Sequence, residues 1–225
     1  MAGCLVLSAC SGPLSVLEPE SASARDATTL WWVMAYAGTG IFIATASVLV
    51  LAVVRPAWLR AFGEARLILW GGLVIPLVLL AGLVAAAFAL GERGIAAARE
   101  PAALRIEAVA RQWIWQFHYP GGHVTTNLLH LPAGRDVDIV LTSEDVIHSF
   151  WVPRLAGKLD AIPGHTNILR LHADRIGKYG GVCAEYCGIG HAPMRFDVEV
   201  HEEETFRGIV APLAPEADAA GEGGE

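Results

Sequence analysis

Two long stretches of this 225-residue sequence contain no charged side chain at all. One runs from Ala27 to Val54, 28 residues, and the other from Leu67 to Gly91, 25 residues. Because about 20 apolar residues in a helix cross the hydrocarbon core of a bilayer, each run is long enough to span it. The alternative is a pair of buried core helices, but such helices rarely run so far without a charge, so membrane-spanning helices are favoured. The sequence predicts a transmembrane helical hairpin, with helices at about 30–54 and 67–90.

Cysteine is scarce as well, with four residues in the chain. Cys4 and Cys10 lie in the N-terminal leader, and the stretch "LSAC" from Leu7 to Cys10 resembles a bacterial lipobox, in which the cysteine becomes the lipidated first residue. The residues before it lack the basic charge and length of a normal signal, which indicates a start codon further upstream. Residues 1–26 are therefore expected to be a signal and N-terminal segment.

Basic residues are concentrated in the connection between the two apolar runs. Residues 55–66 carry Arg55, Arg60 and Arg66 against one acid, Glu64. Short basic loops stay in the cytoplasm, so both chain ends are predicted to lie on the other side. A lipobox requires the same orientation. We therefore expect a multi-pass protein of a bacterial inner membrane, in contact with lipid, with its C-terminal half in the periplasm or outside.

From Glu92 onward the composition becomes acidic, with 19 acidic and 12 basic residues, and no nucleic-acid partner is expected. Stretches of alternating apolar and polar residues predict strands at 104–111, 136–142, 167–173 and 196–200, with Pro-Gly turn signals between them. Many short strands in about a hundred residues predict a β-sandwich or small barrel over 92–211. The segment 202–211 is expected to form a closing helix of one or two turns, and the tail 212–225 to be disordered.

One loop carries an unusual set of side chains, "GGVCAEYCGIGHAPMRF" from Gly180 to Phe196. Its thiols, imidazole and thioether fall at positions i, i+4, i+8 and i+11: Cys183, Cys187, His191 and Met194. That spacing would line one face of a helix, but the glycines and the proline between them break a helix repeatedly. The sequence therefore predicts a loop that folds these side chains around a small object.

Three kinds of site fit such a loop. A disulfide between Cys183 and Cys187 would use the thiols alone, and zinc would take the thiolates and a histidine but has no use for a methionine. Copper is favoured, because soft thiolate and thioether ligands with imidazole select it, and a weak axial methionine marks copper electron-transfer sites. Two cysteines could each bridge two copper ions. The second ion would then need another imidazole, which His148 could supply from a segment just after a predicted strand.

At this point the sequence resembles cytochrome c oxidase subunit II over roughly residues 28–210. The resemblance rests on His148, the spacing of 35 positions to Cys183, the run C-A-E-Y-C-G-I-G-H-A-P-M, and the segments "EDVIHSFWVPRLAGKLDAIPGHTN" and "RQWIWQF". It implies an α+β membrane protein, a two-helix hairpin followed by an exported cupredoxin-like Greek-key β-barrel. The chain departs from the family at Phe150-Trp151 and in a short stretch between Trp115 and Val137.

The resemblance implies a binuclear copper centre of the type called CuA. Cys183 and Cys187 would bridge two copper ions, and His148 and His191 would each bind one. Met194 would make a long thioether contact to one of the ions. Bridging thiolates spread the charge of a shared electron over two metals and two sulfurs, so each bond changes little on reduction.

Other residues take roles by the same resemblance. The Glu185 carbonyl would contact the second copper ion weakly, and its side chain would bind magnesium at the junction with a haem-bearing subunit. Trp113 would receive the electron, whereas Trp115 fits core packing equally well. Glu144 and Asp145 are the best-placed acids for the lysine-rich face of a cytochrome c.

The implied function is that of an electron-input subunit of a haem-copper terminal oxidase. It would accept electrons from cytochrome c and pass them to haem in subunit I, where oxygen is reduced to water while the complex translocates protons. Quinol oxidase subunit II, nitrous oxide reductase and a membrane-anchored copper carrier or assembly factor are the alternatives. No role is assigned to Asp160, and the remaining histidines are expected to be loop or surface groups: His118, His123, His130, His165, His172 and His201.

Overall fold

The computed structural model describes residues 11–57, 63–97, 102 and 104–211. The predicted lipobox at Cys10, part of the basic loop at 58–62 and the predicted disordered tail 212–225 lie outside the described residues. The chain divides into two compact units. One comprises the helices of residues 26–99, and the other comprises residues 1–25 together with the β-domain that follows residue 100.

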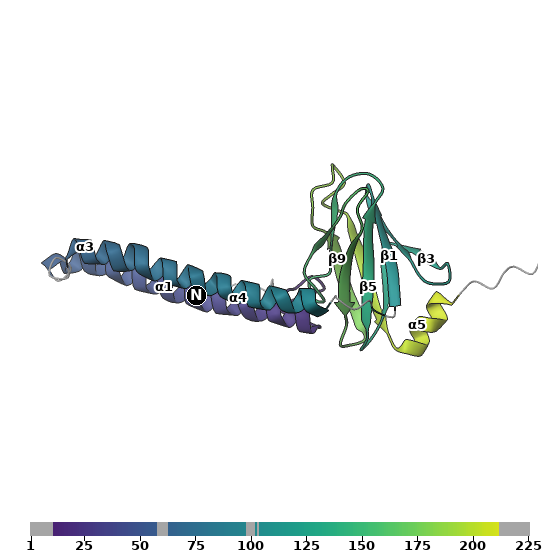
Figure 1. The fold of residues 1–225 in the computed structure, drawn as a ribbon, viewed down its shortest axis with the longest axis horizontal. Coiled ribbons are helices and arrows are strands. Elements are labelled where there is room, and N and C mark those ends of the chain that lie inside the picture. The colour runs from purple at the N-terminus through teal and green to yellow at the C-terminus, as the bar shows by residue number, and fades with distance from the viewer. Residues whose placement is uncertain (1–10, 58–62, 98–101, 103, 212–225) are drawn as a thin grey trace, which may run out of the picture. The chain divides into compact units, whose positions relative to one another are not determined.

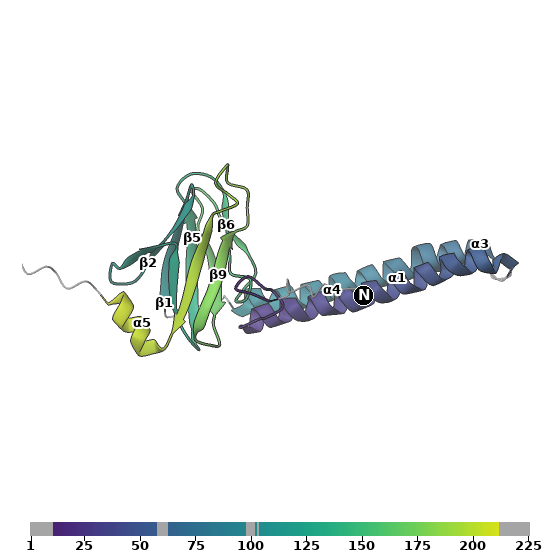
Figure 2. The ribbon, with the colours of Figure 1, turned by 180° about the vertical axis from the view of Figure 1, so that it is seen from behind.

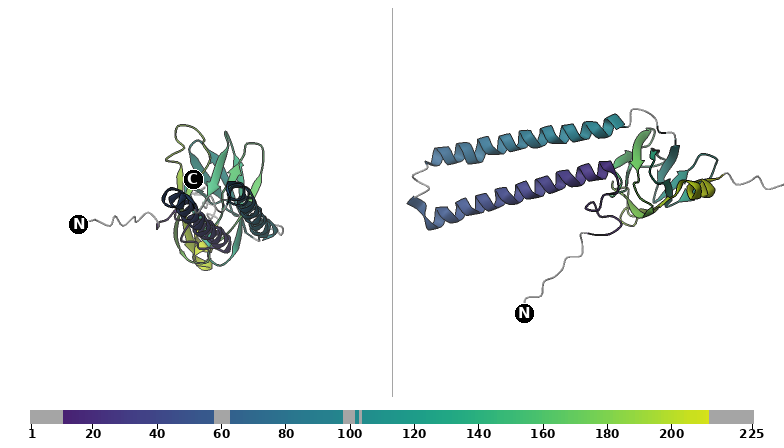
Figure 3. Two further views of the ribbon diagram at one scale, coloured as in Figure 1. Left: turned by 90° about the vertical axis from the view of Figure 1, so that its left-hand side faces the viewer. Right: turned by 90° about the horizontal axis from the view of Figure 1, so that it is seen from below.

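Two long helices make up the first unit (Figure 1). The first is α1, Ala22–Val54, and the second is a continuous helical run of α3 (Glu64–Arg66), the π-helical η2 (Leu67–Val74) and α4 (Ile75–Ala97). The two run side by side in opposite directions as a hairpin (Figure 3). Both are long and apolar enough to cross a membrane, and their apolar side chains are exposed rather than buried within the chain. This exposure suits a helix whose solvent is lipid.

Both helices are longer than the charge-free runs predicted. Helix α1 begins at Ala22 rather than near residue 30 because Ser21 caps it, with the Ser21 hydroxyl oxygen accepting a hydrogen bond from the Ala24 N–H at 2.9 Å. Such a cap satisfies one of the free N–H groups of the first turn. Helix α1 therefore begins with a short polar segment, residues 22–26, before the charge-free run that starts at Ala27 and is long enough to span a bilayer.

The N-terminal segment before α1 is attached to the β-domain. The Glu20 N–H donates to the carbonyl of Arg154 at 2.8 Å, and the Glu20 carboxylate lies 3.1 Å from the guanidinium groups of both Arg154 and Arg175. Further along, Gly180 donates its N–H to the carbonyl of Pro13 at 3.2 Å. Residues 13–21, part of the predicted signal and N-terminal segment, thus contact the folded β-domain.

The β-domain is a sandwich of two five-stranded sheets. The first sheet contains, in spatial order, β3 (Val124–Thr126), β2 (Ile114–His118), β1 (Leu104–Arg111), β5 (Asp136–Ser143) and β8 (Asn167–His172). The second contains β4 (Leu128–Pro132), β10 (Arg195–His201), β9 (Gly177–Cys183), β6 (His148–Trp151) and β7 (Leu159–Ala161). The four strands predicted from alternation are confirmed as β1, β5, β8 and β10.

Both sheets contain parallel as well as antiparallel strand pairs. Strand β1 pairs in parallel with β5, and β4 pairs in parallel with β10, whereas the other pairs are antiparallel. This arrangement is consistent with the predicted cupredoxin-like fold, although the two sheets do not share a ladder and the domain is therefore a sandwich. After β10, the helix α5 (Glu203–Val210) lies at one end of the sandwich, and the loop after β9 lies at the other (Figures 1 and 2).

Aromatic side chains fill the core beneath the β9–β10 loop. Trp115, Phe117 and Phe150 are fully buried, which confirms Trp115 as a core residue. The ring of Phe150 stacks on Phe196 with centroids 4.9 Å apart. A Cβ atom on Gly181 would come within 2.1 Å of the Phe196 ring, so only glycine allows this aromatic layer to form against β9. Trp115, Phe117, Phe150 and Phe196 thus form a densely packed aromatic layer that supports the loop.

Candidate metal centre

Strand pairing brings together the two parts of the predicted cluster. His148 is the first residue of β6 and Cys183 the last residue of β9, and these strands pair antiparallel with Phe150 opposite Cys183. The Ala184 N–H donates to the carbonyl of Ser149 at 2.8 Å, which continues the pairing into the loop. His148 therefore lies beside Cys183 although 35 positions separate them in the sequence.

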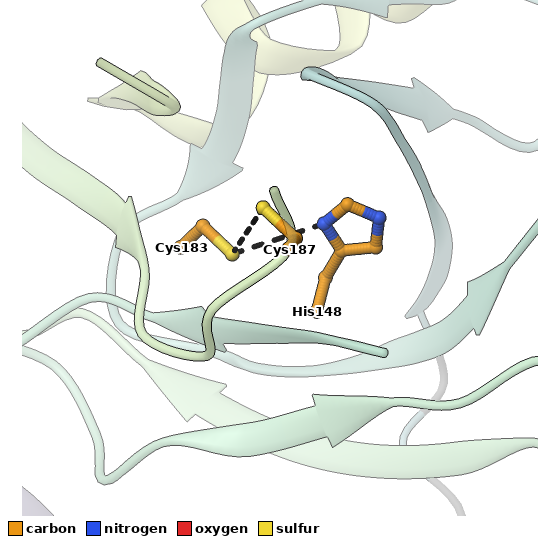
Figure 4. A group of neighbouring side chains, drawn as sticks. All are labelled: His148, Cys183 and Cys187. Carbon is orange, nitrogen blue, oxygen red and sulfur yellow. Dashed lines mark hydrogen bonds between the residues drawn. The ribbon is translucent and has the colours of Figure 1, made fainter. Parts of the chain in front are cut away.

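The sulfur and nitrogen atoms of the cluster face one another (Figure 4). The Cys183 Sγ lies 3.8 Å from the Cys187 Sγ and 3.8 Å from Nδ1 of His148. On the other side, the Cys187 Sγ lies 3.7 Å from Nδ1 of His191 and 3.6 Å from Sδ of Met194. A disulfide requires a sulfur–sulfur bond of about 2.05 Å, so both cysteines are free thiols.

These donors fit a soft metal. Sulfur–metal bonds of about 2.3 Å and nitrogen–metal bonds of about 2.0 Å allow one ion to reach both thiols, since the two sulfurs are 3.8 Å apart. Each thiol has its own imidazole, and Met194 adds a thioether on the Cys187 side. The Glu185 carbonyl oxygen accepts a hydrogen bond from the Cys183 thiol at 3.3 Å, which puts a weak oxygen donor on the opposite side. Two thiols, two imidazoles and a thioether form the donor set that copper prefers.

Burial controls the protonation of the cluster. His148, Cys183, Cys187 and Met194 are all buried, and His191 is half-buried. Burial, reinforced by the neighbouring Cys183, raises the pKa of the Cys187 thiol to about 12. The metal-free thiol is therefore protonated at neutral pH, and a metal that binds there as a thiolate complex releases the proton.

Asp145 orients the first imidazole. The His148 Nε2–H donates to Oδ1 of Asp145 at 2.9 Å, which leaves the Nδ1 lone pair facing Cys183. The other carboxylate oxygen accepts the backbone N–H of Gln112 at 2.7 Å. Burial raises the pKa of Asp145, but the hydrogen bonds from Gln112, His148 and Val146 outweigh it and hold the pKa below its usual range. The sequence suggested Asp145 only as a docking acid, and its position three residues before His148 was the available signal.

Trp113, the residue predicted to receive the electron, contacts the loop that carries the cluster. The Cys187 carbonyl accepts hydrogen bonds from Nε2 of Gln112 at 2.8 Å and from Nε1 of Trp113 at 3.2 Å. Trp113 is 36% exposed, so its side chain contacts both solvent and the loop between β9 and β10. A Cβ atom on Gly190 would come within 2.3 Å of this ring, so glycine at this position lets the indole lie against the loop.

The Glu185 carboxylate is not brought into the cluster. It accepts the backbone N–H of Tyr186 at 3.3 Å, and among the described residues it joins no group of metal-ligating side chains. The prediction of loop or surface positions was wrong for His130, which is buried. His201 is the last residue of β10, and its Nε2 lies 2.9 Å from Nδ1 of His130. Their separation of 71 positions gave the sequence no signal of this contact.

Residues 123–201 match the family described as "Cytochrome C oxidase subunit II, periplasmic domain". Curated proteins named cytochrome c oxidase subunit 2 are also similar. The protein of Thermostichus vulcanus is 45% identical over 103 residues, which are 46% of this chain and 31% of the relative. That of Alkalihalophilus pseudofirmus is 39% identical over 114 residues, which are 50% of this chain and 33% of the relative. The matching region therefore spans about a third of the length of these relatives.

Among solved structures, the periplasmic domain of subunit II of cytochrome oxidase (CoxB) of Bradyrhizobium japonicum is 31% identical, with a TM-score of 0.47. The match covers 49% of this chain and 93% of that domain. A chain from a heme-copper terminal oxidase dimer is 28% identical, with a TM-score of 0.45, and the match covers 58% of this chain and 97% of that one.

The hairpin, the sandwich and the sulfur-rich cluster define a class of protein, a membrane-anchored β-sandwich with soft metal ligands gathered at one end. The sequence matches identify the family within that class. Residues 123–201 belong to the periplasmic-domain family of cytochrome c oxidase subunit II, and the curated relatives that match the chain are named cytochrome c oxidase subunit 2.

Proposed function

We propose that this chain is the electron-input subunit of a haem-copper terminal oxidase in a bacterial inner membrane. It accepts single electrons from cytochrome c and passes them to haem in subunit I, where oxygen is reduced to water and the complex translocates protons. The single observation that carries this proposal is a cluster at one end of the domain in which the two cysteine sulfurs lie 3.8 Å apart and each ligand atom of His148, His191 and Met194 lies within 3.8 Å of one of them.

The cluster residues would hold two copper ions, with the thiolates of Cys183 and Cys187 shared between them. When bound, the two ions would supply a one-electron redox centre. The chain's part is to keep the donors in place. They come from the start of β6, the end of β9 and the loop between β9 and β10, next to the aromatic layer of the core. Because this layer is densely packed, the donor atoms would move little when the metal centre gains or loses an electron.

Trp113 gives the cluster a contact with the outside. Its indole is partly exposed and donates a hydrogen bond to the carbonyl of Cys187, so one side chain joins the surface to a cluster residue. A cytochrome c that docks over this indole would therefore lie against a route to the thiolate made of one hydrogen bond and the covalent bonds of Cys187. Glu144, which is exposed, provides negative charge nearby for a lysine-rich partner.

Glu185 is proposed to act at the other partner surface. Its carbonyl faces Cys183, and its carboxylate is left half-buried beside Tyr186. Ligands from subunit I would complete a magnesium site with this carboxylate, because hard cations take several oxygen ligands. Glu185 would thus couple the thiol cluster to the haem-bearing subunit.

The test is to purify the full-length chain in detergent, add copper, and record copper content with optical and EPR spectra. We expect two copper ions per chain and a purple, mixed-valence centre. One exchangeable ion per chain would instead support a copper carrier. A colourless protein with a Cys183–Cys187 disulfide would refute the copper role.

Asp145 provides a test of how the donors are oriented. The three nearest groups to its carboxylate are N–H donors, those of Gln112, Val146 and His148 Nε2, and the Ser143 hydroxyl lies further away at 3.4 Å. In Asp145→Asn, the amide NH₂ is itself a donor and must face one of these N–H groups. The hydrogen bonds that hold the His148 ring in place are therefore weakened. Loss of such a supporting hydrogen bond lowers metal affinity by about 10–100-fold. Competition with a copper chelator measures this change.

Glu144→Gln is the matched control for Asp145→Asn, since it removes the neighbouring charge from an exposed position. It should leave copper affinity unchanged. Equal losses in both variants would show that net charge, rather than the hydrogen bond to His148, sets the affinity.

A further inference from the structure

A second group of metal-ligating side chains lies on the outer side of the second sheet: His130, Glu199 and His201. Strands β4 and β10 are parallel there, with His130 directly opposite Glu199. His201 follows Glu199 by two positions, so both side chains project to the same face of β10. Sheet register alone therefore brings two imidazoles and a carboxylate together.

The donor atoms of this group are close to one another. Nδ1 of His130 lies 2.9 Å from Nε2 of His201 and 4.0 Å from Oε2 of Glu199. Nε2 of His201 lies 3.9 Å from the same carboxylate oxygen. With nitrogen–zinc and oxygen–zinc bonds of about 2.0–2.2 Å, ligand atoms around a tetrahedral ion stand roughly 3.3 Å apart, so small side-chain rotations would satisfy one ion.

We propose that His130, Glu199 and His201 form a second metal site, one that binds a borderline divalent transition ion such as Zn²⁺. Two histidines and a glutamate are an established zinc ligand set, in which a fourth position remains open to water. The partial exposure of Glu199 and His201 provides that open position. This inference does not rest on the proposed electron-transfer function.

The site is built into the domain. His130 is buried, and its backbone N–H donates to the Tyr119 hydroxyl at 2.7 Å. Tyr119 in turn packs against Phe206 of α5, with ring centroids 6.4 Å apart. Burial, together with neighbouring His201, lowers the pKa of His130 despite the opposing effect of Glu199. The contacts with Tyr119 therefore fix the part of β4 that carries this imidazole.

This second group is separate from the first cluster. Met194 immediately precedes β10, whereas Glu199 and His201 lie at its far end, just before α5. At about 3.3 Å per strand residue, seven residues place the two groups roughly 20 Å apart. Zinc at the second group would join the edge strand β4 to β10 without contact to the thiols.

Lys178 opposes the binding of a cation. Its ammonium lies 2.8 Å from Oε1 of Glu199, on a side chain that is otherwise largely exposed. An incoming divalent ion would be repelled by this charge and would compete with it for the carboxylate. Removal of Lys178 should therefore strengthen metal binding, an effect that a misfolded variant would not produce.

The experiment uses the full-length chain in detergent with Cys183→Ser and Cys187→Ser, so that the thiol cluster does not take up the ion. Zinc is titrated by calorimetry, and Co²⁺ is titrated by its visible absorption as a probe of geometry. We expect one ion per chain, tetrahedral or five-coordinate cobalt absorption, and a melting temperature that rises with zinc because only the folded chain forms the site.

His201→Asn and Glu199→Gln should each weaken zinc binding by about tenfold or more, because each removes one of three ligands. Lys178→Ala should strengthen it several-fold. His172→Asn is the matched control, since His172 pairs with two carboxylates, Asp136 and Asp174, but has no second imidazole beside it.

Zinc affinity that is the same in His201→Asn as in the parent, or lost equally in His172→Asn, would overturn the proposal. No zinc binding by the parent and by Lys178→Ala would overturn it too, and would show that the two imidazoles share only a hydrogen bond. Neither result bears on copper binding, because the chain tested lacks both cysteines of the first cluster.

Discussion

Cys187→Ser is expected to abolish the purple two-copper spectrum of the full-length chain. The Cys187 Sγ is the most connected donor of the cluster, with Cys183, His191 and Met194 all within 3.8 Å. A serine hydroxyl is a hard ligand, and it does not form the soft bridging bonds that copper takes from a thiolate. Optical and EPR spectra should lose the mixed-valence features, and bound copper should fall from two ions per chain to one or none.

The matched control for Cys187→Ser is Tyr186→Phe in the same loop. Tyr186 is exposed and gives the cluster no ligand atom, so its variant should keep both copper ions and the parent spectrum. Cys183→Ser should repeat the loss. A Cys187→Ser protein that still binds two ions with an unchanged spectrum would show that the thiolates are not shared between the metals.

Trp113→Ala is expected to slow reduction of the copper-loaded chain by cytochrome c by roughly 10²-fold, the size of effect that misplacing a reacting group produces. The ring is the exposed end of a hydrogen-bonded route to Cys187, but it supplies no ligand atom. The copper spectrum should therefore be unchanged. Stopped-flow mixing with reduced cytochrome c measures the rate, and the spectrum is recorded on the same sample.

Gly190→Ala tests the same contact from the other side. Its new Cβ atom would overlap the indole, so the ring must leave its place while every ligand remains. The rate should fall as in Trp113→Ala. Gly157→Ala is the control, because a Cβ atom there meets nothing within 4 Å and the rate should not change. Loss of the copper spectrum in Trp113→Ala would mean that the indole supports the metal site instead of electron transfer.

The sequence was sufficient to predict the parts of the protein that depend on local pattern. Charge-free runs longer than a bilayer predicted the helices, and alternation predicted β1, β5, β8 and β10. The spacing of Cys183, Cys187, His191 and Met194 falls on one short loop, so chain connectivity already confines these side chains to a small volume. His148 was proposed because a second ion would need another imidazole, and the family resemblance pointed to the same residue. Its spacing of 35 positions from Cys183 did not by itself predict the contact.

Tertiary structure decided what depends on contacts between distant strands and segments. Pairing of β6 with β9 put His148 beside Cys183, and only then did Asp145 become the residue that orients it. The parallel register of β4 and β10 brought His130, Glu199 and His201 together, although nothing in their spacing predicted it. The physical reason is that side-chain periodicity fixes which face of the sheet a residue takes, whereas its neighbour on the adjacent strand depends on which strands pair. When those strands are far apart in the chain, no short-range pattern in the sequence identifies the pair.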